Sequence, residues 1–328
     1  MFKGGKMRGA GLPGAALVIT AVWATLTTAA NAQTINWKQL SPGTSPPTRS
    51  YPSMTYDPVS KKVVLFGGFN GQYLNDTWTF DGTTWTKQST STAPPMRTAA
   101  TMAFDRITRK VVLFGGYNGF NYLGDTWLWD GSTSTWTQAH PTTSPKAVTG
   151  PMVFTDPADG HADVYGGFDG NLYQLTTYQW TGTNWKNMNP ANSATARSLA
   201  VCATDAAAKS TVLFGGLADV NPDNTWTWDG TTWTEQSPAT QPNNRYGANA
   251  AYETPLKIVI AFGGGEGGVD VNDTWSWNGT TWTQLTPATS PAAREGFGMA
   301  YDAAFKHIVI FGGQNGNTFY GDTWALVK

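Results

Sequence analysis

The stretch KVVLFGG at residues 62–68 decides the fold, because variants of it recur along the chain. Each variant is an apolar run that ends in a glycine pair, and the pairs begin at residues 67, 115, 166, 215, 263 and 312. Successive pairs are therefore between 48 (67 to 115) and 51 (115 to 166) residues apart. A short continuous apolar run is typical of a strand that is buried on both faces. The fixed period indicates six copies of one structural unit.

Each unit is expected to contain four antiparallel strands. In the second unit these are RTAATMAFD (97–105), KVVLFGG (110–116), DTWLWDG (125–131) and STWTQ (134–138), with turn residues between them. One such unit cannot bury both of its faces alone, whereas six arranged radially can. The sequence therefore predicts an all-β fold, a six-bladed β-propeller.

The last unit lacks its fourth strand, because the chain stops at GDTWALVK (321–328). Near the other end, INWKQL (35–40) precedes SPGTSPPTR just as TTWTQL (280–285) precedes TPATSPAAR. The segment from Ile35 to Leu40 is therefore expected to complete the C-terminal blade. This pairing would close the ring and cover an otherwise exposed strand edge.

Two long segments resemble kelch repeats. They are PPTRSYPSMTYDPVSKKVVLFGGFNGQYLNDTWTFDGTTWTKQ (46–88) and PAAREGFGMAYDAAFKHIVIFGGQNGNTFYGDTWALV (291–327). Both share a Pro-x-Arg-type start, a glycine doublet and spaced aromatic residues, and the resemblance extends over residues 33–328. It implies a kelch propeller of the exported bacterial type. Because that fold hosts scaffolds, binding modules and some enzymes, the function has to be argued from the site.

The first 32 residues read as a signal peptide. Basic MFKGGKMR is followed by a short apolar segment and by ANA (30–32), which has the form of a signal-peptidase site. Cleavage is expected between Ala32 and Gln33. The mature chain, residues 33–328, would then be a single propeller, secreted or periplasmic, without membrane insertion.

The composition of the chain excludes some classes of binding partner and excludes stabilisation by disulfides. The formal net charge is −1 with few charged residues, so no nucleic-acid partner is expected. The single cysteine, Cys202, excludes an internal disulfide framework. A closed ring needs no second chain to cover its edges, so a monomer is expected.

Alignment of the repeats with one another separates framework residues from candidates for function. Fifteen of the sixteen tryptophans fall into three columns, which predicts packing between blades rather than sugar stacking. The glycine doublets are followed by strands rather than helices, which argues against a phosphate-binding loop. A further column holds Arg49, Arg97, Arg197, Arg245 and Arg294, here named the blade arginines. Each is expected to pair with the acid, such as Asp125, that opens the third strand of its own or a neighbouring blade.

No metal or cofactor is expected. One kelch-type propeller family is a radical copper oxidase with a Tyr-Cys cofactor, but here Cys202 falls in a column of inner-strand core residues. His140, His161 and His307 are spread over connections that should emerge on different faces. They do not make up a copper site, and no spacing of His, Cys or Glu indicates zinc.

The loops after the glycine doublets vary most, and variable loops on a rigid framework are where recognition usually occurs. These Gly-Gly loops are residues 69–75, 117–124, 168–175, 217–224, 265–272 and 314–321. Aromatic and amide residues there can bind a glycan or a protein or peptide ligand. The predicted function is a non-catalytic binding module, with a ligand-binding set of Tyr73, Tyr117, Tyr122, Phe168, Tyr320 and the blade arginines Arg49, Arg97, Arg197, Arg245 and Arg294.

An alternative enzyme function follows from the kelch resemblance. Exported bacterial kelch propellers include a sialic-acid mutarotase (N-acetylneuraminate epimerase), which works on a sugar at the channel mouth. The candidate catalytic residues here are Glu266, Glu295, Arg245, Arg294 and Tyr246. Such catalysis requires one group with a pKa near the working pH and another that binds the sugar carboxylate. No dedicated catalytic motif accompanies these residues.

Overall fold

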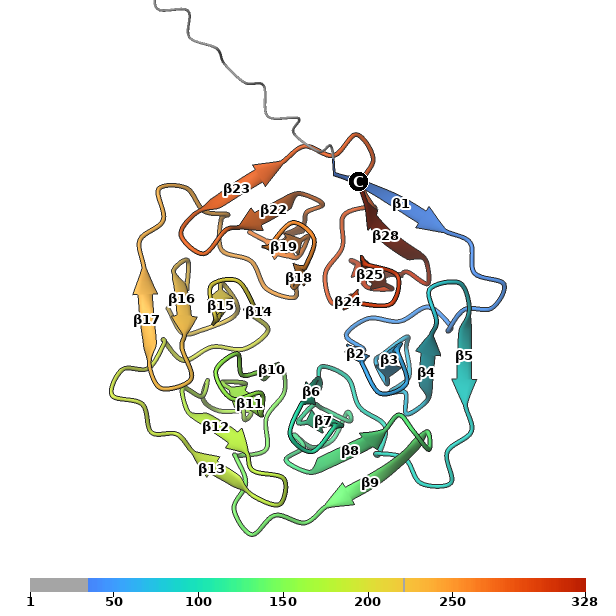
Figure 1. Cartoon of the computed structure of the whole chain (residues 1–328), viewed down its shortest axis with the longest axis vertical. Helices are drawn as coiled ribbons and strands as arrows, with labels where there is room; N and C mark the ends of the chain where they lie inside the picture. The colour runs from blue at the N-terminus through green and yellow to red at the C-terminus, as the bar shows by residue number, and fades with distance from the viewer. Residues whose placement is uncertain (1–34, 221) are drawn as a thin grey trace, which may run out of the picture. The chain divides into compact units, whose positions relative to one another are not determined.

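The computed structural model describes residues 35–220 and 222–328, and the predicted signal peptide at residues 1–32 lies outside them. The described residues form one compact unit. Six four-stranded antiparallel sheets are arranged as blades around a central axis, as Figure 1 shows. This confirms the predicted six-bladed all-β propeller. No helix in the described part of the chain is both long and apolar enough to cross a bilayer.

The strands of the first three blades follow one another in the sequence. Blade one contains β2 (Ser53–Asp57), β3 (Lys62–Phe66), β4 (Thr77–Phe80) and β5 (Trp85–Gln88). Blade two contains β6 (Thr101–Asp105), β7 (Lys110–Phe114), β8 (Thr126–Asp130) and β9 (Thr135–Ala139). Blade three contains β10 (Met152–Thr155), β11 (Ala162–Tyr165), β12 (Thr177–Trp180) and β13 (Trp185–Asn187).

The second half of the ring adds two small hairpins to the same pattern. Blade four contains β14 (Val201–Asp205), β15 (Ser210–Phe214), β16 (Thr225–Trp228) and β17 (Trp233–Gln236). Blade five contains β18 (Asn249–Glu253), β19 (Ile258–Phe262), β22 (Thr274–Trp277) and β23 (Trp282–Leu285), with the hairpin β20 (Gly265–Glu266) and β21 (Val269–Asp270) in its Gly-Gly loop. Blade six contains β24 (Gly298–Asp302), β25 (His307–Phe311), β28 (Thr323–Val327) and β1 (Asn36–Leu40), with the hairpin β26 (Gln314–Asn315) and β27 (Thr318–Phe319).

The N-terminal strand closes the ring as predicted. Strand β1 pairs antiparallel with β28, and Trp37 lies opposite Leu326 in the register. The sheet order β1-β28-β25-β24 places this strand at the outer edge of blade six, where Figure 1 shows it next to the C-terminus. Blade six is therefore assembled from both ends of the described chain.

Packing between neighbouring blades forms the core, and the outer-strand tryptophans are its largest repeated component. Trp37 is 2% exposed, and its indole N–H donates to the Thr274 hydroxyl of blade five at 3.0 Å. Each other blade repeats this contact with the blade before it: Trp85 to Thr323, Trp136 to Thr77, Trp185 to Thr126, Trp233 to Thr177 and Trp282 to Thr225, at 2.8 to 3.0 Å. The predicted packing role of this tryptophan column is confirmed.

The glycine doublets let each Gly-Gly loop begin tightly against the next blade. Gly67 and Gly68 both have positive φ, at 67° and 106°. A Cβ atom on Gly67 would lie 2.6 Å from the carbonyl oxygen of Arg97, which is closer than a non-bonded carbon and oxygen can approach. The Gly68 amide donates to that same carbonyl at 2.9 Å. Glycine is required here by backbone conformation and by the close approach together.

Candidate functional site

The blade arginines are buried in their own blades. Arg97 is 1% exposed, and its two Nη atoms donate to the two carboxylate oxygens of Asp125, both at 2.7 Å. The predicted pairing is confirmed, and it occurs within a blade. Equivalent two-pronged contacts at 2.5 to 3.1 Å join Arg49 to Asp76, Arg245 to Asp273 and Arg294 to Asp322, while Arg197 donates to Asn224 at 2.7 Å.

Most of the remaining hydrogen bonds of these arginines go to backbone carbonyls. Arg97 donates to the Gly115 carbonyl at 3.1 Å and to the Pro95 carbonyl at 3.0 Å, while Asp125 also accepts the indole N–H of Trp127. Burial alone would raise the pKa of Asp125, but the hydrogen bonds and charge of Arg97 outweigh it and lower that pKa. The blade arginines are thus buried out of reach of a ligand, and their charge is used to fix the base of five of the six Gly-Gly loops.

Aromatic side chains from four neighbouring blades form a continuous arc on the Gly-Gly loop face. Within one loop, Phe69 contacts Tyr73 with ring centroids 5.0 Å apart, and Tyr73 contacts Tyr117 of the next blade at 5.9 Å. All of these pairs are tilted or edge-to-face, an arrangement that aromatic rings favour. In order around the ring, the arc is Phe319, Phe69, Tyr73, Tyr117, Tyr122, Phe168 and Tyr173, with successive centroids 4.8 to 6.0 Å apart.

Glycines in the loops make room for the arc. The ring of Tyr73 lies over Gly119 of the next loop, where a Cβ atom would come within 2.5 Å of it. Tyr122 lies over Gly170 in the same way, at 2.4 Å. Each aromatic loop therefore supports the loop that follows it, so the arc is one surface rather than separate side chains. It includes four of the predicted ligand-binding residues, while Tyr320 stacks on the guanidinium of Arg294 at 4.2 Å.

Exposed apolar side chains accompany the arc. Phe120 is 82% exposed at the tip of the second Gly-Gly loop, and Leu172 and Leu175 are 52% and 49% exposed in the third. Large apolar groups that are so open to water are typical of an interaction surface. The sequence prediction included the aromatic residues but did not single out the two leucines.

A separate pocket lies where the hairpins of blades five and six meet. It has a volume of about 390 Å³ and is lined by Tyr246, Gly268, Val269, Asp270, Glu295, Asn315 and Gly316. The amide of Gly316 donates to Asp270 at 3.3 Å, which joins the two hairpins across the blade boundary. The pocket thus combines two carboxylates with a tyrosine and flexible glycines.

Burial raises the pKa values of both carboxyl groups in this pocket, Glu295 and Asp270. The Oε1 of Glu295 accepts from Gln314 at 3.0 Å, whereas its buried Oε2 has no hydrogen-bond partner among the described residues. Burial raises the pKa of Glu295, and the charge of Asp270 adds to the shift. Burial together with the Glu295 charge raises the pKa of Tyr51 well above its usual value. A carboxyl group with raised pKa beside tyrosines can take part in proton transfer or bind a cationic group.

The structure separates the other residues that the enzyme alternative grouped together. Glu266 pairs with Arg245 at 3.2 Å and accepts from Asn243, so both charges are already satisfied. Arg294 is fully buried beneath Tyr320. Of the five predicted catalytic residues, only Tyr246 and Glu295 line the pocket, and neither arginine reaches it with a free donor.

Two residues of this cluster, Tyr51 and Asp270, were not predicted as site residues. Tyr51 stands two positions after a blade arginine, where the other four blades with such an arginine have Ala99, Leu199, Gly247 and Gly296. An aromatic residue occurs at this position only in the first of these five blades, and that departure was visible in the repeat alignment. The position of Asp270 was not, because it depends on the hairpin formed by β20 and β21.

The family model for the KLHDC2/KLHL20/DRC7 Kelch-repeats domain matches residues 22–216, more than half of the chain. The chain belongs to the kelch-repeat family. No curated protein matches it in sequence. Kelch propellers act in general as binding and interaction modules, and this kelch propeller has the variable loops and rigid blades such a role requires.

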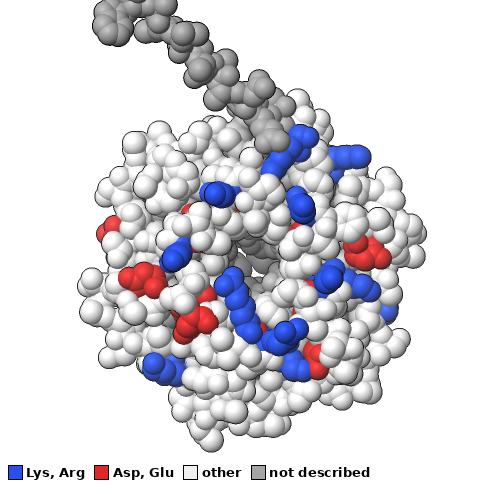
Figure 2. Space-filling model, in the orientation of Figure 1, with Lys and Arg blue, Asp and Glu red and all other residues white. Residues whose placement is uncertain are grey.

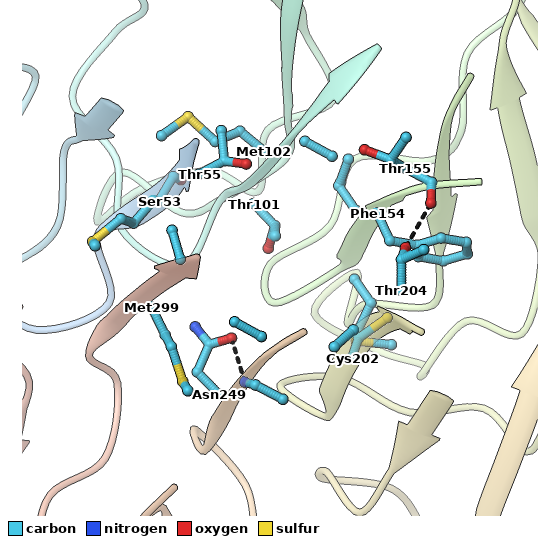
Figure 3. A pocket seen from close by; sticks show the side chains of 18 of the residues that line it. Ser53, Thr55, Thr101, Met102, Phe154, Thr155, Cys202, Thr204, Asn249 and Met299 are labelled. Atoms are coloured by element: carbon cyan, nitrogen blue, oxygen red, sulfur yellow. Dashed lines mark hydrogen bonds between the residues drawn. The ribbon is translucent and has the colours of Figure 1, made fainter. Parts of the chain in front are cut away.

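The central channel of the kelch propeller forms a cavity of about 410 Å³ lined by the innermost strands. Figure 3 shows Met102, Met299, Thr101 and Asn249 around this space. Among the described lining residues the one charged side chain is Arg106, which belongs to a turn rather than a strand. The described channel wall therefore offers no carboxylate, ammonium or imidazole group, and its titratable side chains besides Arg106 are tyrosines and Cys202.

Cys202 faces the same channel from β14, as Figure 3 shows. Burial raises the pKa of its thiol well above the usual value, which makes it a poor nucleophile at neutral pH. His161 lies 3.1 Å from Asp105 at the end of a strand. Across residues 35–220 and 222–328, no three His, Cys, Asp or Glu side chains gather as potential metal ligands.

Proposed function

We propose that the protein is an exported, non-catalytic binding module that takes an extended polypeptide ligand on its Gly-Gly loop face. The observation that carries this proposal is the seven-ring aromatic arc across four blades. Partly exposed Tyr and Phe rings held edge to face provide a large contact area at low cost in conformational entropy. Because the arc is supported from loop to loop, it is organised before the ligand binds.

A polypeptide fits this surface through its apolar and its charged features. Phe120 and Leu172 are more than half exposed and offer contacts to apolar side chains. Beyond Phe319, the hairpin that starts the arc also borders the pocket of Glu295 and Asp270. A ligand lying along the arc is thus able to place a lysine, an arginine or an amino terminus in that pocket.

Selection from a displayed peptide library on the purified protein tests this function. Replacing both Phe120 and Leu172 by alanine should weaken binding of the selected peptides by about thirtyfold, since each exposed apolar group buried on binding contributes about 1 kcal/mol. Val220→Ala is the control, because Val220 is 77% exposed in the fourth Gly-Gly loop and lies outside the aromatic arc. Equal loss in the control variant, or no selected peptide at all, would count against the polypeptide ligand.

A glycan is the second candidate, favoured by the tyrosine hydroxyls and by the amide groups of Asn70, Asn118 and Asn121 in the aromatic loops. Neutral sugars bind to aromatic faces flanked by such hydrogen-bonding groups. A glycan array probed with the same protein decides between the two ligands. If the protein binds one class of glycan, and the Phe120 and Leu172 variant does not, the ligand of the aromatic arc is a glycan and not a polypeptide.

Sugar processing remains the alternative activity, and the raised pKa of Glu295 in its pocket is the observation that favours it. The buried state of Arg245 and Arg294 weighs against a sialic-acid substrate, because the sugar carboxylate would meet no free guanidinium. An anomerisation assay with sialic acid is the test. Acceleration by the protein that is lost in Glu295→Gln would establish the mutarotase activity, and an unchanged rate removes it.

We propose an extracytoplasmic location, secreted or periplasmic, on the basis of the leader in residues 1–32. Mass spectrometry of the exported protein should find an amino terminus at Gln33. Light scattering should find a monomer, as a closed ring needs no second chain to cover its edges. A full-length cytoplasmic product would contradict the export.

A further inference from the structure

The face opposite the Gly-Gly loops has a ring of basic residues that the proposed function does not use. On this face the turn between the first and second strand of each blade follows the innermost strand and so lies beside the channel. Figure 2 shows basic side chains surrounding a central opening. Six exposed residues of these turns, here named the basic ring, are Lys61, Arg106, Arg109, Lys209, Lys257 and Lys306.

Five of these residues hold a basic side chain in an unfavourable backbone conformation. Lys61, Arg109, Lys209, Lys257 and Lys306 all have φ between 52° and 59°. This is the left-handed region, where glycine is favoured and a long side chain is strained. Blade three shows the alternative, because Gly160 occupies the position there with φ of 87°. Because the turn of blade three forms with glycine at this position, a basic side chain is not needed there for folding.

The blade that lacks this basic residue receives one from its neighbour. The Arg106 amide donates to the Gly160 carbonyl at 2.8 Å, and a Cβ atom on Gly160 would lie 3.1 Å from the Arg106 side chain. Arg106 therefore lies against the turn of blade three and also lines the channel. The basic ring thus places a cation beside the turn of blade three, although that turn has no basic residue of its own and carries the exposed Asp159.

The cations of the ring are not used within the propeller. Among the described residues, none of the six lies within 4.0 Å of a carboxylate oxygen in an ion pair. The acids at the base of the turns are occupied by turn backbone instead, as Asp105 accepts from Thr108 at 2.7 Å and Asp57 from Val59 at 2.9 Å. Unpaired like charges around one opening concentrate positive potential there.

Apolar side chains stand beside the cations. Ile107 is 59% exposed between Arg106 and Arg109, and Phe305 is 42% exposed beside Lys306. An anionic polysaccharide or a small anion has no apolar side chains to pack against these groups, whereas a peptide can carry acidic and apolar side chains together. We propose that the basic ring is a second binding site, at the channel mouth, for an acidic polypeptide segment that also contains apolar residues.

The site is tested with a fluorescent peptide of alternating Glu and Leu, with the Gln-Leu peptide as its uncharged counterpart. The Glu-Leu peptide should bind at low salt, and about 1 M salt should abolish binding, since the Debye length then falls to about 3 Å. Lys257→Glu combined with Lys306→Glu should weaken binding at least tenfold, as exposed charge pairs of this kind contribute up to about 1 kcal/mol each and reversal adds repulsion. Equal binding of the Gln-Leu peptide would overturn the proposal.

Two matched variants separate binding from folding. Lys38→Glu combined with Lys186→Glu reverses the same number of exposed charges on outer strands and should leave peptide binding unchanged. Lys257→Gly combined with Lys306→Gly relieves the left-handed backbone strain, so the melting temperature should stay level or rise while peptide binding falls. Loss of binding in the outer-strand variant, or retention of binding in the glycine variant, would overturn the proposal.

The same titration with a sulfated polysaccharide tests whether the basic ring binds polyanions in general and not acidic peptides in particular. Tighter binding of the polysaccharide than of the Glu-Leu peptide, lost in the Lys257 and Lys306 variant, would show that the ring recognises anions without regard to apolar groups. That result would overturn the polypeptide ligand. Failure at this ring leaves the aromatic arc untouched, because the two sites lie on opposite faces and are probed by different variants.

Discussion

Replacing Trp37 by alanine should destabilise the whole propeller, although this residue lies near the start of the described chain. Trp37 is 2% exposed among residues of blades five and six, in contact with Phe262 at a centroid distance of 5.2 Å. Truncating a buried tryptophan costs about 3 to 5 kcal/mol. The Thr274 hydroxyl loses its indole donor as well, at about 1 kcal/mol, which favours the upper end of that range.

Urea unfolding of residues 33–328 measures this loss, and Trp85→Ala is the matched control. Trp85 occupies the same column in blade one, is 1% exposed and donates to Thr323 at 3.0 Å. If β1 is a full member of blade six, the two variants lose similar free energies of unfolding. A loss below about 1 kcal/mol for Trp37→Ala alone, or unchanged stability on removal of residues 33–40, would refute the closure, because exposed truncations have effects of that size.

Further predictions concern the framework. Arg97→Ala should cost about 3 kcal/mol in urea unfolding, since it leaves the partly buried Asp125 carboxylate unpaired, and a loss under about 1 kcal/mol would contradict the buried pairing. Because the pKa values of Asp76 and Asp125 are lowered in the fold, their contribution is complete above the unfolded value of about 3.9 and disappears as pH falls below it. Acid titration should therefore show a steep loss of stability below pH ~4, absent in a variant without these pairs. Gly67→Ala should destabilise by more than about 1 kcal/mol through its positive φ and its contact with a backbone carbonyl, which thermal melting would measure. Cys202 should react with iodoacetamide far more slowly than a free thiol at pH 8, given its raised pKa, and fast labelling would show that the channel thiol is exposed as thiolate.

The framework was predictable because it repeats. A column shared by five or six blades, such as the blade arginines with their acids, shows both partners at a constant spacing, so their pairing follows from the alignment alone. The same reasoning placed β1 in blade six, because Trp37 filled the gap in its column. Repetition alone does not indicate function: the blade arginines recur in five blades, and the buried Arg97 shows that this column holds the fold together.

The candidate site was less predictable because it depends on contacts between loops that differ. The loop tyrosines were visible as likely binding residues, but their union into an arc requires Tyr73 to lie over Gly119 of the next blade. No single repeat contains both residues. The pocket of Glu295 likewise depends on two hairpins that only blades five and six form among the described residues. The basic ring could not be predicted from the net charge of the chain, because net charge sums over both faces of the molecule.

Carbene footprinting of the protein with a selected peptide ligand tests the central claim, that the Gly-Gly loop face binds the ligand, most directly. We expect protection of residues 117–124 and 168–175, which contain Phe120 and Leu172, and no change on the outer strands. Protection confined to the outer strands, or to the turns of the opposite face with the aromatic loops still fully labelled, would contradict the account.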